Sequence, residues 1–501
     1  MSDHESLRFG NRDFSIGVWI KCSNDTNSIP GDIVGKYDPD SRKGINFHVS
    51  SSSPGYSSVS DVRNVHFGID NAVEGTWIDC GRPWPSNTLI GPLIVYQGEL
   101  YTGIADAADP KDACRVFRYA GGKKWVDCGR LGSDPKTVSV IPMIVHKGRL
   151  YAGTGTWDWI KCKNGQAGEA HIYRYEGGIK WHDCGPLPGA TQSLALASFQ
   201  GDLYASVNKK NIFRYDGDNN WTSTVEGWHD LHNSLMVFHG DLYSARIAVR
   251  KYEGGTNWPV VGYFKGSYNI TQIYCMAAYC GEMYLGSWPL GIMLKYEGDG
   301  NWQDCGYVGI DQKWEINEIN DFQVYNGKMY AGAIPKAQVW RYEGGKKWTM
   351  IKQLVDNPNW SPEKEGIETW NRVPSMAIYQ GRLYAGTSTC HGRADANDKT
   401  DAGKVFSWEA GKSVSYDYDL GTESRHLAAV RENDRLKLYV DGKLVATSSS
   451  FKQADYDVSH DKNLLIGFGA EDYFRGNMRD LRIYNRALSA MNVVELAARK
   501  N

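Results

Sequence analysis

Six side chains in this sequence are of types that act as acids, bases or charge-neutralising cations in catalysis. A lyase that cleaves beside a uronate needs a cation that neutralises the substrate carboxylate, and a base such as His or Tyr. Arg246 could supply the cation, and His232 or Tyr268 could supply the base. The full set of candidate catalytic residues is His232, Arg246, Tyr268, Glu318, Arg372 and His391.

A hydrolytic reaction would use carboxylates instead. Glycoside hydrolysis needs two carboxyl groups at a defined separation, and Glu318 could pair with Asp230 or with Glu315. Asp230 lies between His229 and His232 in a polar segment. The competing interpretation for each of these residues is structural, because polar side chains at such positions also hydrate an inner channel.

Eight tryptophans form a second group of candidates, for binding rather than catalysis. A flat aromatic ring with a polar edge suits the C–H faces and hydroxyls of a sugar. Packing within large loops is the competing interpretation for any single tryptophan. With Asn320 added, the candidate substrate-binding residues are Trp84, Trp157, Trp159, Trp228, Trp288, Trp314, Trp360, Trp370 and Asn320.

Signals for a metal or cofactor are sparse. Asp395, Asp398 and Asp401 recur at every third residue and could chelate Ca²⁺ with oxygen ligands. A solvated acidic loop is the competing interpretation. The sequence has no phosphate-binding loop, Cys-x-x-Cys pair or zinc-helix motif. We therefore expect no required cofactor, with Ca²⁺ as the one optional ion.

A repeated unit predicts the scaffold that positions these residues. Seven times, an apolar run is followed by Gly, two residues and Tyr. The glycines are Gly98, Gly148, Gly201, Gly240, Gly281, Gly327 and Gly381, and the tyrosines are Tyr101, Tyr151, Tyr204, Tyr243, Tyr284, Tyr330 and Tyr384. Most units continue with a strand that ends in Arg-Tyr or Lys-Tyr. A Gly-rich turn then leads to a last strand that begins with Trp. Four strands in roughly 40–50 residues indicate a β-propeller blade.

The ends of the repeat predict how the ring closes. We name the four strands of each unit a, b, c and d in chain order. The first d strand, at Trp77, comes before the first a strand, and no d strand follows the last c strand. We expect residues 77–80 to complete the last of seven blades, which leaves no open edge. The chain then enters and leaves the propeller on the side of the a–b and c–d turns.

The candidate residues map to one face of this propeller. All eight tryptophans lie in d–a or b–c loops, opposite the side where the chain enters. Tyr268, Glu318, Asn320 and Arg372 lie at or just before the start of an a strand, which lines the central channel. Arg246 occupies a b-strand position where the sister units have small or apolar residues.

The segments outside the repeat also have β patterns. Residues 14–20 and 436–440 alternate apolar and polar side chains, and residues 480–489 read Asp-Leu-Arg-Ile-Tyr-Asn-Arg-Ala-Leu-Ser. These segments resemble the laminin-G-like, concanavalin A-like jelly-roll family. The resemblance implies a jelly-roll β-sandwich made of residues 1–76 and 412–501. Together with the repeat, it predicts an all-β chain in which a seven-bladed β-propeller (77–411) is inserted into this jelly roll. That family often binds Ca²⁺, and we map no complete ligand set here.

Composition and cysteine positions limit the partners. The chain has 56 basic and 58 acidic side chains, so no basic face for nucleic acid is expected. It contains no long apolar run that would span a bilayer and no visible signal peptide.

The cysteine positions bear on the compartment. Cys80, Cys128, Cys184 and Cys305 share one position in separate units, too far apart for disulfides. Free thiols favour a reducing compartment, whereas the jelly-roll resemblance favours an extracellular one, and the conflict stays open.

These observations predict a carbohydrate-directed protein that acts on an oligo- or polysaccharide at the d–a/b–c loop face of the propeller. Catalysis, as a polysaccharide lyase or glycosidase, is left open. The alternatives are a non-catalytic, lectin-like adhesion protein and a protein-interaction scaffold. Propeller enzymes offer an analogy at the level of the fold alone, which carries little weight.

Overall fold

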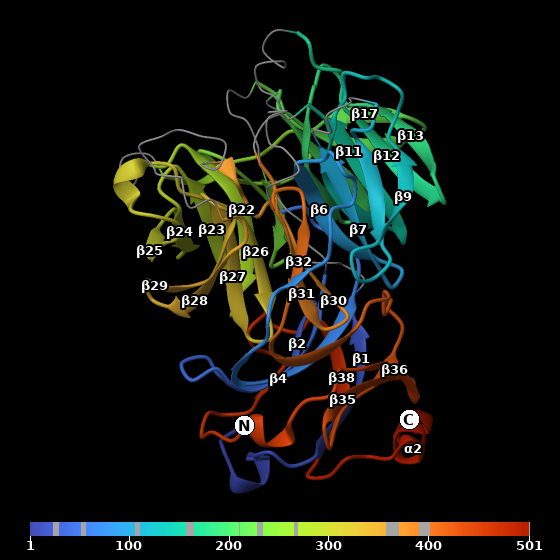
Figure 1. The fold of residues 1–501 in the computed structure, drawn as a ribbon, viewed down its shortest axis with the longest axis vertical. Coiled ribbons are helices and arrows are strands. Elements are labelled where there is room, and N and C mark those ends of the chain that lie inside the picture. Colours follow the sequence, from blue (N-terminus) through green and yellow to red (C-terminus); the bar gives the residue numbers. More distant parts are fainter. Residues whose placement is uncertain are drawn as a thin grey trace.

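The computed structural model describes residues 1–23, 30–51, 57–105, 111–156, 165–209, 211–227, 234–264, 269–356, 370–389 and 401–499. Two β domains are stacked along the long axis, and both chain termini lie in the lower, smaller domain (Figure 1). None of the helices in these ranges has the length and apolarity that crossing a membrane requires.

The larger domain consists of four-stranded antiparallel units arranged around an axis (Figure 1). The described strands form seven such units, and one bridge between Ser139 and Ala105 joins the first two. In chain order the units are β6 (Leu89–Tyr96), β7 (Glu99–Ala105), β8 (Arg115–Tyr119) and β9 (Trp125–Arg130); β10 (Ser139–His146), β11 (Arg149–Gly155), β12 (His171–Gly177) and β13 (Lys180–Pro186); β14 (Ser193–Phe199), β15 (Asp202–Val207), β16 (Asn211–Gly217) and β17 (Asn220–Ser223); β18 (Ser234–Phe238), β19 (Asp241–Ala245), β20 (Ala248–Lys251) and β21 (Val260–Tyr263); β22 (Gln272–Tyr279), β23 (Glu282–Trp288), β24 (Ile292–Tyr296) and β25 (Trp302–Tyr307); β26 (Glu318–Tyr325), β27 (Lys328–Ile334), β28 (Gln338–Gly344) and β29 (Lys347–Gln353); and β30 (Met376–Tyr379), β31 (Arg382–Gly386), β32 (Val405–Trp408) and β5 (Ile78–Asp79).

The repeated glycine makes the tight turn of each unit. In the first unit Gln97 and Gly98 have φ values of 49° and 78°, and two consecutive residues with positive φ make the turn that matches the twist of a two-residue hairpin. The last unit is completed from the start of the propeller segment, since Phe406 pairs with Asp79 and Ser407 with Ile78. The predicted closure of the ring is therefore confirmed.

The tryptophans that begin the outer strands link neighbouring units. The indole Nε1 of Trp125 donates to the carbonyl of Cys80 at 2.9 Å, and that of Trp181 donates to Cys128 at 2.8 Å. Trp221, Trp258 and Trp348 repeat this bond. Because an outer strand has unpaired carbonyls, each bond satisfies one of them. Cys80, Cys128, Cys184 and Cys305 are buried free thiols, as predicted.

The smaller domain is a sandwich of two five-stranded sheets. One sheet has the order β36 (Lys443–Thr447), β35 (Arg435–Val440), β34 (Arg425–Glu432), β1 (Phe14–Cys22) and β38 (Gly476–Tyr484). The other has the order β33 (Ala410–Tyr416), β4 (Asn64–Glu74), β3 (Lys43–Ser50), β2 (Gly31–Asp38) and β37 (Leu465–Ile466). Each sheet combines strands from both flanks of the propeller, as the inserted arrangement requires.

Apolar side chains between the two sheets form the core of the smaller domain, with Phe14, Phe47 and Phe67 fully buried. Helix α2 (Ala490–Ala498) covers β34 with Val493 and Leu496. The short 3₁₀ helices are η1 (Glu5–Leu7), η2 (Gln312–Trp314) and η4 (Gln453–Asp455).

The outer face of the β33–β4–β3–β2 sheet packs against the tight turns of the propeller. The amide of Asn326, in the β26–β27 turn, donates to the carbonyls of Ile69 at 3.0 Å and Ala410 at 2.8 Å. Gly68 makes room for it, because a Cβ there would lie 2.1 Å from the Asn326 side-chain oxygen. The jelly roll therefore attaches on the a–b turn side, as predicted from the strand order.

Candidate functional site

A segment of the jelly roll, residues 57–61, blocks one end of the propeller channel. Val59 exchanges backbone hydrogen bonds with the inner strand β14, donating to Leu196 at 2.8 Å and accepting from Ser198 at 2.8 Å. Ser57 interacts with Met276 of β22, so the segment touches more than one inner strand. We call residues 57–61 the plug.

Serine hydroxyls hold the plug to backbone groups that the channel walls leave unpaired. The Ser58 hydroxyl accepts from the Leu196 N–H at 3.1 Å, and the Ser60 hydroxyl accepts from the Val145 N–H at 3.1 Å. The cavity beside Val59, between Met236, Met276 and Phe322, measures about 40 Å³, which is room for about one water. A ligand would therefore approach the channel from the opposite, loop face.

Three of the predicted polar residues meet where β26 begins, and we call Glu318, Asn320 and Arg372 the polar trio. The Arg372 Nη1 lies 3.6 Å from the Glu318 Oε1, and the amide of Asn320 donates to the same oxygen. All three are buried. Glu318 and Asn320 come from the sixth unit, and Arg372 precedes the inner strand of the seventh.

Burial controls the charge of the trio. Desolvation raises the pKa of the Glu318 carboxyl, while Arg372 and the Asn320 amide oppose the rise. A carboxyl whose pKa is raised can hold a proton closer to neutral pH, as a general acid must. The trio can therefore bind hydroxyls, neutralise a carboxylate or donate a proton.

Unpaired acceptors surround the trio. Within the described ranges, the Asn320 Oδ1, the Asn371 Oδ1 and the Ser388 Oγ are buried and have no hydrogen-bond partner. Ser388 and Arg372 exchange backbone hydrogen bonds at 2.8 and 3.0 Å, so these atoms lie close to the trio. Buried polar atoms nearly always have a hydrogen-bond partner in native proteins. Three such atoms without a partner in one place therefore indicate a bound ligand or ordered water.

Arg246 lies directly after β19 and is half-buried. Its carbonyl accepts from the N–H of Ile273 in β22 at 2.7 Å. The structure thus places it in the fourth unit, beside the inner strand of the fifth. Glu315, the possible partner of Glu318 in hydrolysis, is exposed at the end of η2 and accepts a hydrogen bond from Asn269.

Four of the eight tryptophans lie within the described residues, and all four are half-buried. Trp84 packs against Phe117, with the Arg115 guanidinium 5.6 Å from its ring. Trp314 lies under the Lys313 ammonium at 5.0 Å. Trp288 ends β23 and its buried Nε1 has no hydrogen-bond partner in the described part of the chain. Trp370 adjoins the trio in sequence, and its carbonyl accepts from the Arg372 Nε at 3.4 Å.

The remaining candidates lie outside the described residues. They are His229, Asp230, His232, Tyr268, His391, Trp157, Trp159, Trp228, Trp360, Asp395 and Asp398. Asp401, the third member of the acidic series, forms an ion pair with Lys404 at 2.6 Å. The ranges that the structure describes contain no group of three or more His, Cys, Asp or Glu that could hold a metal.

A group of buried acids and histidines lies in the jelly roll beneath the propeller. The rings of His48 and His66 stack at 5.0 Å, and the His48 Nε2 lies 3.3 Å from the Glu471 Oε1. Desolvation lowers the pKa of His66 to about 4 and raises the pKa of Asp32 to about 7. Asp32 nevertheless accepts hydrogen bonds from the N–H groups of Glu471 and Asp472. The group joins the β2 and β3 strands to residues 471–472.

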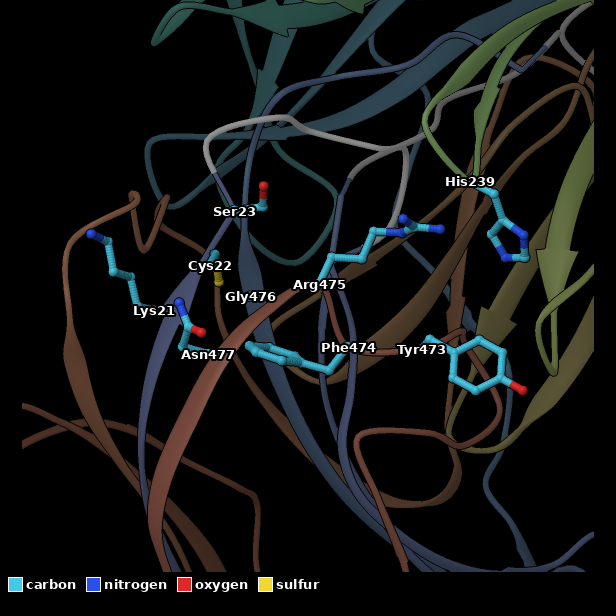
Figure 2. A pocket seen from close by; sticks show the side chains of 9 residues that line it. All are labelled: Lys21, Cys22, Ser23, His239, Tyr473, Phe474, Arg475, Gly476 and Asn477. Carbon is cyan, nitrogen blue, oxygen red and sulfur yellow. The ribbon is translucent and has the colours of Figure 1, made fainter.

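Sequence reasoning missed a hollow between the two domains (Figure 2), which we call the interdomain hollow. It measures about 920 Å³ and is lined by Lys21, Cys22, Ser23, His239, Tyr473, Phe474, Arg475, Gly476 and Asn477. His239 comes from the β18–β19 turn of the propeller, and the other residues come from the jelly roll. No repeat or motif marks these residues, because they meet only after the domains dock.

A family model described as the concanavalin A-like lectin/glucanases superfamily matches residues 355–494. A search of curated proteins found no match. Among solved structures, the chain is similar to YCF48 from Cyanidioschyzon merolae (11% identity, 67% of this chain and 99% of that chain, TM-score 0.43). It is also similar to a catalytically inactive virginiamycin B lyase from Staphylococcus aureus with quinupristin (9% identity, 66% and 98% covered, TM-score 0.46), and to the WD40 β-propeller domain of Doa1 (10% identity, 66% and 97% covered, TM-score 0.42).

The family match confirms the resemblance to a concanavalin A-like jelly roll. The strand pairing confirms the predicted fold class, an all-β chain in which a propeller interrupts that jelly roll. A concanavalin A-like domain combined with a propeller supports a carbohydrate-binding or a protein-interaction role.

Proposed function

We propose that this protein binds a carbohydrate at the d–a/b–c loop face of its propeller, with the polar trio at the base of the site. The observation that carries the proposal is the set of buried, unpartnered acceptors beside the trio. Sugar hydroxyls are donors that would satisfy these acceptors, and the Arg372 guanidinium would donate to sugar oxygens. Trp370, which is half-buried and adjoins the trio, would supply the flat apolar surface that sugar rings prefer.

One further observation supports this location, and a second supports a carbohydrate as the ligand, because the matched family model covers residues 355–494 and thus mostly the jelly roll. The plug blocks the opposite end of the channel, which leaves the loop face as the side of approach. The description of the matched family model names lectins and glucanases, and the ligands of these proteins are carbohydrates. We favour carbohydrate binding over a protein-interaction scaffold, because the hydroxyl groups of a small ligand can reach acceptors at the end of a channel more readily than a protein surface can.

Cleavage of the bound sugar is the second candidate function. It is favoured by the raised pKa of Glu318, because a general acid must be protonated near the working pH. Arg372 would then neutralise a substrate carboxylate or the charge that develops in the transition state.

The test uses the full chain and a panel of neutral and acidic oligosaccharides, measured for binding and for new reducing ends or unsaturated product. The double variant Glu318→Gln/Arg372→Met removes both charges together, so neither is left buried alone. We expect it to weaken binding at least about tenfold, since charged hydrogen bonds contribute about 1.5–3 kcal/mol each.

The matched control is Arg214→Met/Asp216→Asn, which removes an arginine–carboxylate pair from the outer part of the third unit. It should bind like the wild type. If no oligosaccharide binds, or if both double variants bind equally well, the proposed site is wrong. If product forms, Glu318→Gln alone should abolish it, and unchanged turnover would exclude Glu318 as the acid.

A further inference from the structure

The interdomain hollow has the size and position of a ligand site. Its volume of about 920 Å³ lies within the range of small-molecule pockets, which occur preferentially at domain interfaces. The end of β1 supplies Lys21, Cys22 and Ser23, and residues 473–477 lead into β38 on its other side. Figure 2 shows the β1 residues on one side and His239 of the propeller on the other, with the Lys21 side chain turned away from Arg475.

The described lining of the hollow includes two cations, Lys21 and Arg475. Lys21 and Arg475 have no carboxylate partner among the residues that the structure describes, and the buried Arg475 Nε has no hydrogen-bond partner there. Figure 2 shows the Arg475 side chain extending toward His239. The Asp472 carboxylate is buried beside the hollow, where its Oδ1 lies 3.2 Å from the His239 Nε2 and accepts from the Tyr473 N–H at 2.7 Å.

The other lining groups in the described part of the chain include no carboxylate. Burial raises the pKa of the Cys22 thiol to about 11, which keeps it neutral. Asn477 and Ser23 supply neutral hydrogen-bonding groups, and the half-buried Phe474 supplies an apolar surface. Guanidinium and ammonium groups beside amide, hydroxyl and aromatic side chains recognise an anion carried on a polar ring.

We propose that the interdomain hollow is a second binding site, which takes an anionic sugar through Arg475 and Lys21. The anion is a ring carboxylate or a sulfate ester, which present the same oxygen acceptors to these cations. The choice of a sugar as its carrier rests on the proposed function, whereas recognition of the anion rests on the hollow alone. This site differs from the polar trio in domain, lining and charge.

The test measures binding of an oligogalacturonate to the full chain by calorimetry, beside its methyl ester, a sulfated oligosaccharide, a neutral oligosaccharide and inorganic sulfate. We expect the charged oligosaccharides to bind at least about tenfold more tightly than the methyl ester and the neutral sugar. Binding should weaken with added salt, because salt screens exposed charges. Equal binding of charged and neutral sugars would overturn the proposal, and so would inorganic sulfate binding as tightly as the sugars.

Two variants locate the site. Arg475→Gln and Lys21→Gln should each weaken oligogalacturonate binding about tenfold, and Lys21→Gln keeps the test valid if Arg475→Gln fails to fold. Lys180→Gln, on the exposed strand β13, makes the same charge change elsewhere and should have no effect. If oligogalacturonate binding is lost only in the Glu318→Gln/Arg372→Met variant, the hollow is not the site and the proposed function stands. If binding is lost only in the hollow variants, this inference stands and the proposed loop-face site is wrong for that ligand.

Discussion

The bonds between neighbouring propeller units can be tested with two tryptophans that differ in one contact. Trp181 donates its indole N–H to the Cys128 carbonyl at 2.8 Å. Trp302 occupies the same place in the fifth unit, and its buried Nε1 has no partner in the described part of the chain. We predict that Trp181→Phe destabilises the protein more than Trp302→Phe does.

The magnitude follows from what the two substitutions share. Both rings are half-buried and pack at a tilt against a tyrosine of the same unit, at 4.8 Å and 43° for Trp181 and at 5.0 Å and 43° for Trp302. These shared contacts cancel in the comparison. Trp302 also packs against Phe264 at 4.9 Å, and the partial loss of that contact offsets the gain from removing its unpaired N–H. Trp181→Phe also leaves the Cys128 carbonyl unpaired, at about 1–3 kcal/mol, whereas Trp302→Phe removes a donor that was already unsatisfied. The expected difference is about 2 kcal/mol.

The assay is urea unfolding followed by far-ultraviolet circular dichroism, with the free energy of unfolding taken from curves of equal m value. A difference of about 2 kcal/mol changes the folded-to-unfolded ratio about 30-fold. Equal losses in the two variants, or a larger loss in Trp302→Phe, would refute the idea that the indole hydrogen bonds hold neighbouring units together.

Two further predictions concern the jelly roll. Asp32 has a folded-state pKa of about 7 against an ordinary value of 3.8, so its contribution to stability is present below pH 4 and is lost as pH rises through 7. Asp32→Asn removes this titration. The free energy of unfolding of the variant, relative to that of the wild type, should therefore rise between pH 4 and a pH above 7, by up to about 4 kcal/mol. A difference between variant and wild type that does not change with pH in thermal unfolding would contradict this. Gly68→Ala should cost about 1–3 kcal/mol by overpacking against Asn326, and an unchanged melting temperature would show that the interface yields freely.

The propeller was predictable because its signals are local. Each tight turn needs two residues with positive φ, as at Gln97 and Gly98, so a glycine recurs beside every inner strand. The closure at Trp77 followed from counting strands, and it needed no knowledge of contacts. The positions of the polar trio were predictable for the same reason, because the starts of neighbouring a strands lie at the same end of the channel. The contact between Glu318 and Arg372 was not predicted, since the sequence paired Glu318 with Asp230 or Glu315.

The roles of individual tryptophans were harder to predict. Trp84 was predicted to bind substrate because its loop lies on the d–a/b–c side. In the structure it packs against Phe117 and beneath the Arg115 guanidinium. Position in a repeat identifies the face on which a side chain lies, whereas its neighbours depend on loop lengths that the repeat does not determine.

The plug and the interdomain hollow gave no signal in the sequence. The Ser57 hydroxyl bonds to Met276, which is 219 residues away, and no periodicity relates the two. The only local trace is the small, polar composition of residues 57–61, which suits hydrogen bonding to a channel wall but also suits an ordinary loop. Contacts between domains depend on how two finished surfaces fit, so pattern alone cannot supply them.

The place of the insertion explains how two domains share one chain without weakening either. The chain leaves the jelly roll after β4 and returns at β33, and these two strands are paired neighbours in one sheet. It enters the propeller at β5 and leaves from β32, which are also paired. Both crossings therefore lie side by side.

The two crossing segments are also joined directly. The Gly75 N–H donates to the Glu409 carbonyl at 2.8 Å, the Trp408 indole donates to the Gly75 carbonyl at 3.0 Å, and the rings of Trp77 and Trp408 stack at 5.4 Å. When β5 pairs with β32 and closes the propeller ring, the adjoining strands β4 and β33 are brought close together. When β4 pairs with β33 in the jelly roll, β5 and β32 are in turn brought close together. Each domain thus shortens the loop that the other must close, which reduces the entropy lost in closing it.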